Sequence, residues 1–138
     1  MGLDYYVWRR PRLTADEFSQ RLWDLDEHDL DEASLFEWSD RLIRFRREIL
    51  ARYPPLEQLE DTSDTPWSMT PVESTRFIAL NLNGHPTREQ VVFIMGRALR
   101  NGLYIYDAQD HEVFAPGPAL WQIYLRRVGL SGLAGRDP

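Results

Sequence analysis

Cysteine and lysine are both absent from this chain of 138 residues. Without cysteine the protein has no disulfide bond, no thiolate zinc ligand and no cysteine nucleophile. Without lysine it has neither a Schiff-base amine nor the lysine of a phosphate-binding loop. All 16 basic residues are arginine, whose planar guanidinium group forms forked contacts with carboxylates and phosphates. Several enzyme classes are therefore excluded before any motif is considered.

Long hydrophobic runs are also lacking. No segment approaches the roughly 18 apolar residues that a membrane-spanning helix requires. The first 12 residues carry charges where a secretory signal peptide would have an apolar stretch. The net charge of −6 disfavours nucleic acid as a partner, because phosphate binding requires a basic footprint. The sequence thus predicts a cytoplasmic protein that binds neither membranes nor nucleic acid.

The charges that are present are distributed unevenly. Eight acidic residues and no arginine lie between Asp24 and Asp40, whereas Arg41 to Arg52 contains five arginines and one glutamate. An acidic block beside a basic helix predicts a surface that meets a charged partner. The predicted protein-binding residues are Trp23, Asp24, Asp26, Glu27, Asp29, Asp31 and Glu32. Trp23 is included because an exposed tryptophan beside carboxylates has the composition of a binding hot spot.

The acidic block has two other interpretations. A calcium loop counted from Asp24 fails, because Asp29 and Leu35 occupy the positions that require glycine and a bidentate acid. A solvated helix end, with acids favourable to the helix dipole, remains an alternative. The three histidines, His28, His85 and His111, are expected in exposed turns, and no serine nucleophile motif occurs. We therefore expect no catalytic residue, no metal site and no cofactor, and a protein that is not an enzyme.

Hydrophobic spacing and turn signals predict an α+β fold. Strands are expected at 3–8, 67–70, 75–83, 103–107 and 112–114, and helices at 14–26, 34–52, 87–100 and 119–128. The element order favours an antiparallel or mixed sheet of four to five strands with helices on one face, a split-βαβ (ferredoxin-like) variant. Trp8 and Trp38 are assigned to the core. Residues 1–128 are predicted to form one domain and 129–138 a flexible tail.

Two segments resemble motifs of a known group of proteins. Met1 to Trp8 fits the pattern M-x-x-D-x-Y-V-W, and Gly102 to Gln109 fits G-L-x-x-Y-D-x-Q, with Ala108 where proline is usual. The chain in this respect resembles a family of small uncharacterised bacterial cytoplasmic proteins. Some members look like immunity proteins of polymorphic toxins, which neutralise a cognate toxin. The resemblance implies a protein partner, for example a basic toxin domain, and supplies no catalytic residue.

Three functions follow as hypotheses. The preferred one is a non-enzymatic immunity protein that neutralises a cognate toxin through its acidic face. The second is a small enzyme or ligand-binding domain with a pocket between sheet and helices, and with Tyr104, Tyr106 and Asp107 near its mouth. The third is a structural subunit or adaptor of a larger bacterial assembly, which docks through the arginine helix and the last helix. Self-association is left open.

Overall fold

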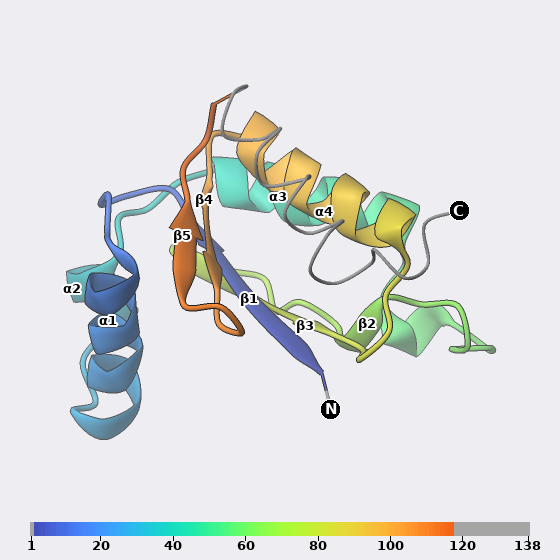
Figure 1. Ribbon diagram of the computed structural model, residues 1–138, viewed down its shortest axis with the longest axis horizontal. Coiled ribbons are helices and arrows are strands. Elements are labelled where there is room, and N and C mark those ends of the chain that lie inside the picture. The colour runs from blue at the N-terminus through green and yellow to red at the C-terminus, as the bar shows by residue number, and fades with distance from the viewer. Residues whose placement is uncertain (1, 118–138) are drawn as a thin grey trace.

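The computed structural model describes residues 2–117 (Figure 1). Its strands are β1 (Leu3–Trp8), β2 (Trp67–Met69), β3 (Phe77–Leu82), β4 (Tyr104–Asp107) and β5 (Glu112–Phe114). Its helices are α1 (Ala15–Glu27), α2 (Glu32–Leu35), α3 (Arg41–Arg52) and α4 (Arg88–Arg100), with a short 3₁₀ helix, η1, at Leu56–Gln58. The helix predicted at 119–128 and the tail predicted at 129–138 lie outside the described residues.

The five strands form one antiparallel sheet in the order β2-β3-β1-β4-β5. The central strand, β1, pairs along its whole length with β3, from Leu3 opposite Leu82 to Trp8 opposite Phe77. Its other edge pairs with β4. The α+β class and the predicted strands are therefore confirmed. Because β1 and β2 both run antiparallel to β3, they are parallel to each other with β3 between them, as a split βαβ unit requires. The ferredoxin-like assignment itself stays a prediction.

Both faces of the sheet are covered by helices. Successive side chains of a strand point to opposite faces, and Tyr5 and Val7 join one buried cluster whereas Trp8 joins another. In Figure 1 helices α3 and α4 lie over one side of the sheet, and α1 and α2 lie on the other. The expectation of helices on one face is therefore wrong. Its physical reason is the run Tyr-Tyr-Val-Trp, which is apolar at every position and so must be buried on both sides.

The larger cluster lies between the sheet and helices α3 and α4. Leu42, Phe45 and Ile49 of α3 are fully buried, and their spacing of three and four residues places them on one helix face. Helix α4 contributes Ile94 and Met95, which are likewise fully buried. This apolar face accounts for most of the hydrophobic stabilisation of the domain.

The smaller cluster, under α1 and α2, is aromatic. Phe18 of α1 lies with its ring centroid 4.5 Å from that of Trp8 and 4.8 Å from that of Tyr106. Trp8 also stacks on Tyr104 at 5.5 Å. The prediction that Trp8 belongs to the core is confirmed, since its side chain is completely buried. Rings at these separations attract one another beyond the area that they bury.

The helix predicted at 34–52 is broken. Helix α2 ends at Leu35 and α3 begins at Arg41, and the buried Phe36 between them is extended. The segment is held to the chain before β3, because Arg76 donates a hydrogen bond to the carbonyl of Phe36 at 3.0 Å. The break changes the phase of the helical stripe, so that Trp38 is 57% exposed. Its assignment to the core is wrong, and Phe36 occupies the interior in its place.

The predicted starts of α1 and α4 and the predicted stop of α4 are confirmed. Thr14 with Glu17, and Thr87 with Gln90, form complete capping boxes at the starts of α1 and α4. Helix α4 stops at Gly102, whose φ of 74° is in the left-handed region that favours glycine. None of the helices among residues 2–117 has the length and apolar character needed to cross a membrane.

Candidate functional site

The seven residues predicted to bind a partner lie on one continuous stretch of surface that α1 and α2 form together. Trp23, Asp24, Asp26 and Glu27 belong to the second half of α1, Asp29 and Asp31 to the connection, and Glu32 begins α2. We call this stretch, Trp23 to Glu32, the acidic surface. Asp24 and Glu32 are half-buried, and the other five residues are exposed. Figure 1 shows α1 and α2 side by side at one end of the molecule, so that this surface faces outward.

Three of these carboxylates serve local structure. Asp24 lies 3.0 Å from the Nδ1 atom of His28 and accepts a hydrogen bond from Gln20 at 3.1 Å. Asp31 caps the start of α2 by accepting from the backbone N–H of Ala33. Glu32 accepts a hydrogen bond from Ser74 at 3.4 Å, which links α2 to the segment before β3. These acids therefore fix the shape of the acidic surface.

The other three carboxylates have no such role. Asp26, Glu27 and Asp29 form no side-chain hydrogen bond or ion pair with any of residues 2–117. Asp29 sits at a turn with a φ of 53°, a conformation that aspartate tolerates better than most residues. Within residues 2–117 the three charges are therefore not neutralised by an ion pair.

Two large apolar side chains are exposed among these acids. Trp23 is 55% exposed and Leu30 is 44% exposed. Sequence reasoning selected Trp23 and missed Leu30, because a leucine at helical spacing ordinarily indicates core. Arg21 of the same helix forms no ion pair with these acids, and its guanidinium donates to the carbonyl of Leu35, which ties α1 to α2. The acidic surface thus combines free negative charge with exposed apolar area on a tethered helix pair.

A hydrogen-bonded chain fixes the start of α1 to the β4–β5 hairpin. The Nδ1 atom of His111 lies 2.8 Å from the Tyr106 hydroxyl, and its Nε2 atom lies 2.7 Å from Asp16. His111 was expected as an exposed turn residue, and it is exposed. Its two partners could not be found from the sequence, because Asp16 is 95 residues away. The arrangement positions the helix that carries the acidic surface.

The residues of the alternative pocket are built into the interior. Tyr104 and Tyr106 pack in the aromatic cluster, and Asp107 is buried at the end of β4. Burial raises the pKa of Asp107, while hydrogen bonds from Asp110 and Gln109 oppose the rise. None of the three lines the cleft at α4 or the cleft between α1 and α2. A ligand-binding role for them stays a prediction, and their packing does not favour it.

The residues that carry the family resemblance form hydrogen bonds with one another at the end of the sheet. The side-chain amide of Gln109 pairs with both the backbone N–H and the carbonyl of Asp4. The same amide donates to Asp107 at 2.9 Å, and Asn81 donates to the Asp4 carboxylate at 2.8 Å. The two motifs therefore join β1 to the turn after β4, which explains why the pattern contains Asp and Gln at these positions.

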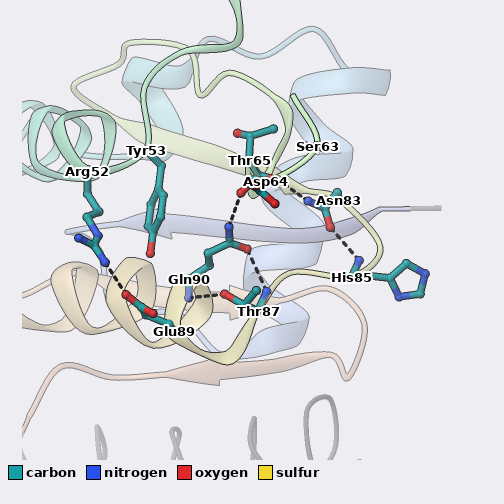
Figure 2. Close-up of a pocket in the computed structure, with 10 residues that line it drawn as sticks. All are labelled: Arg52, Tyr53, Ser63, Asp64, Thr65, Asn83, His85, Thr87, Glu89 and Gln90. Atoms are coloured by element: carbon teal, nitrogen blue, oxygen red, sulfur yellow. Dashed lines mark hydrogen bonds and ion pairs between the residues drawn. The ribbon is translucent and has the colours of Figure 1, made fainter. Parts of the chain in front are cut away.

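A polar cleft of about 320 Å³ lies at the start of α4 (Figure 2). Its lining groups are largely paired with one another: Gln90 donates to the carbonyl of Asp64 at 2.7 Å, and Asn83 donates to that of Thr65 at 2.6 Å. Arg52 forms an ion pair with Glu89 across the same cleft. These polar groups are hydrogen-bonded to one another, and the bond from Gln90 connects α4 to the 63–65 loop.

A second cleft, of about 520 Å³, lies between α1 and α2 beside the acidic surface. Asp16, Gln20, Arg21 and Ser34 are among its lining residues. Within residues 2–117 there is no group of three or more histidines and carboxylates that could hold a metal ion. Comparisons of the chain with protein-family models, with curated proteins and with solved structures find no match.

Proposed function

We propose that this protein is a non-enzymatic binding protein that contacts a basic protein partner through its acidic surface. The observation that carries the proposal is the combination of three unpaired carboxylates, Asp26, Glu27 and Asp29, with two exposed apolar side chains, Trp23 and Leu30. Large aromatic residues supply most of the energy at protein interfaces, and surrounding charges select the partner.

Electrostatics favour a basic partner over an acidic or neutral one. A surface that carries a single sign of charge steers an oppositely charged protein toward it and increases the rate of association at low salt. The backbone that carries these carboxylates is held by the cap of Asp31 and the hydrogen bonds of Asp24 and Glu32, so little backbone entropy is lost on binding. The finer form of the proposal is a cytoplasmic immunity protein whose partner is the basic, substrate-facing cleft of a toxin domain.

The test is affinity capture of the partner with three baits: wild type, a variant of the acidic surface, and a control variant that loses the same charge elsewhere. The bait variant combines Asp26→Asn, Glu27→Gln and Asp29→Asn, and the control combines Glu60→Gln, Asp64→Asn and Glu73→Gln, which remove the same charge elsewhere. We expect wild type and control to retain one stoichiometric basic protein that is released by salt. The acidic-surface variant should bind it about tenfold more weakly at low salt. Equal affinity of both variants would refute the proposal.

The apolar part of the surface is tested separately with the captured partner. Trp23→Ala should weaken binding by about 30-fold or more, mainly through faster dissociation, if Trp23 is a hot spot. Trp38→Ala is the matched control, because Trp38 is equally exposed and lies outside the acidic surface. Binding kinetics measured on the two variants distinguish them, and a Trp38→Ala effect larger than that of Trp23→Ala would place the contact elsewhere.

A further inference from the structure

Three arginines lie where β1 leaves the sheet and α3 begins. Arg9 and Arg10 follow β1 directly, and Arg41 is the first residue of α3. A Cβ atom placed on Gly102 would lie 2.5 Å from the Nη1 atom of Arg41 and 3.8 Å from the Nε atom of Arg9. The Arg9 and Arg41 side chains therefore flank the same backbone turn at the end of α4.

These three guanidinium groups lack acidic partners. None of them forms an ion pair with a carboxylate among residues 2–117. The one hydrogen bond from these guanidinium groups runs from Arg41 to the carbonyl of Asn101, at 3.2 Å. Burial lowers the pKa of Arg9, and the positive charges of Arg10 and Arg41 lower it further. The Arg9 charge is thus half-buried beside the exposed charges of Arg10 and Arg41, which repel it.

The end of α4 offsets only part of this charge. A helix C-terminus is equivalent to about half a negative charge, against three positive ones. The last carbonyls of α4 are already occupied, because Gly102 and Leu103 donate to Leu99 and Ala98 at 3.0 Å each. An uncompensated cluster of like charges destabilises a fold, and such local conflicts are typical of functional sites.

We propose that Arg9, Arg10 and Arg41 form a binding site for an oxyanion of the phosphate class. Guanidinium groups present paired N–H donors that match the oxygens of a phosphate group, and more than one fork can engage a tetrahedral anion. The site is separate from the acidic surface and does not depend on the proposed function. Its ligand is free phosphate or a phosphate group carried by a larger molecule.

The experiment is thermal unfolding in inorganic phosphate against chloride at equal ionic strength. At a phosphate concentration about ten times the Kd, we expect the Tm of wild type to rise by about 3–6 °C above the chloride value. Arg9→Gln and Arg41→Gln should abolish the rise. Arg47→Gln is the matched control and should retain the rise, because Arg47 is an exposed arginine of α3 that lies six residues beyond Arg41. An equal Tm in phosphate and chloride for wild type, or a rise that survives in Arg9→Gln and Arg41→Gln, would overturn the site.

Arg10→Gln supplies a second variant in case the half-buried Arg9 is needed for folding, because Arg10 is exposed. In phosphate-free buffer at low salt this variant should be at least as stable as wild type, since repulsion is relieved, yet it should respond less to phosphate. A simple alkyl phosphate tested in parallel identifies the source of the anion. Stronger stabilisation by the ester indicates the phosphate of a larger ligand, and stronger stabilisation by inorganic phosphate indicates the free ion.

Discussion

Asp107 shows how a single carboxyl group can be buried at the end of a strand. One carboxylate oxygen accepts three hydrogen bonds, from the backbone N–H groups of Gln109 and Asp110 and from the Gln109 side chain. Burial nevertheless dominates, so the pKa of Asp107 is raised in the folded protein. The acceptor oxygen of Asp107 thus stabilises the fold, whereas a negative charge on this carboxyl group destabilises it.

We therefore expect Asp107→Asn and Asp107→Ala to behave differently. Asparagine keeps the acceptor and removes the charge, so its free energy of unfolding at pH 7 should equal or exceed that of wild type. Alanine leaves three donors without their acceptor and should lower this energy by about 2 kcal/mol. Chemical denaturation of both variants measures the difference.

The pH dependence supplies a control for this prediction. Because the folded pKa of Asp107 is above the unfolded value, the ionised carboxylate destabilises the fold at every pH above the folded pKa. The penalty disappears as the pH falls below the unfolded pKa. Any gain in the free energy of unfolding of Asp107→Asn over wild type should therefore be greatest at neutral pH and vanish at about pH 3.5. An advantage that grows as the pH falls would contradict the assignment.

At the scale of elements, helix α4 ends in a left-handed turn that only a few residues accept. The φ of 74° at Gly102 places its Cβ position against the Arg41 side chain. Gly102→Ala should therefore lower the free energy of unfolding by about 1–2 kcal/mol, as seen in urea denaturation. Gly102→Asn is the matched control: asparagine tolerates this conformation and should cost less, although it adds the same Cβ atom. Equal losses would locate the effect in the Arg41 contact.

Elements with local signals were predicted well from the sequence. The aromatic run of β1, the two Thr-led capping boxes and the Asn101–Gly102 stop each depend on residues within a few positions of one another. The break before α3 could not be predicted, because it depends on the contact of Arg76 with Phe36, 40 residues apart. The second covered face of the sheet was missed for another reason: the run Tyr-Tyr-Val-Trp was used only to predict a strand, although its lack of alternation indicates burial on both sides.

In the candidate site, too, features with a local sequence signal were predicted and contacts between distant residues were not. Exposure of the acids between Trp23 and Glu32 was predicted from composition and is confirmed for all but the half-buried Asp24 and Glu32. The partners of His111, and the gathering of Arg9 with Arg41, join residues from opposite parts of the sequence. Only the folded chain brings these groups together, since neither contact leaves a periodic or local pattern.

At the scale of the whole molecule, residues 2–117 form one sheet between two unequal layers. Helix α1 fully buries only Phe18, whereas α4 buries residues along most of its length, including Val91, Ile94 and Met95. Stability that depends on buried apolar contacts is consequently lower in the α1–α2 layer. The acidic surface therefore lies on the layer with the weaker anchorage.

Native-state hydrogen exchange should reveal this inequality. We expect the amides of α1 to exchange through openings at least about 1 kcal/mol less costly than those that expose α4. Phe18→Leu should accelerate exchange in α1 and leave α4 nearly unchanged, because Phe18 belongs to the aromatic cluster and α4 packs in the other one. If the variant accelerates both helices equally, the two layers open as a single cooperative unit.

The central place of β1 has a consequence for the order in which the protein can fold. This strand is made first, yet its two partners, β3 and β4, begin at residues Phe77 and Tyr104. At a translation rate of about 5–20 residues per second, β1 waits roughly 5–20 s for β4 to be synthesised. Until β3 has been made, the apolar side chains of β1 have no strand to join, and until β4 has been made one edge of β1 stays unpaired. The high sequence separation of its pairings should also make refolding slow for a domain of this size, because distant segments must meet before the sheet can form.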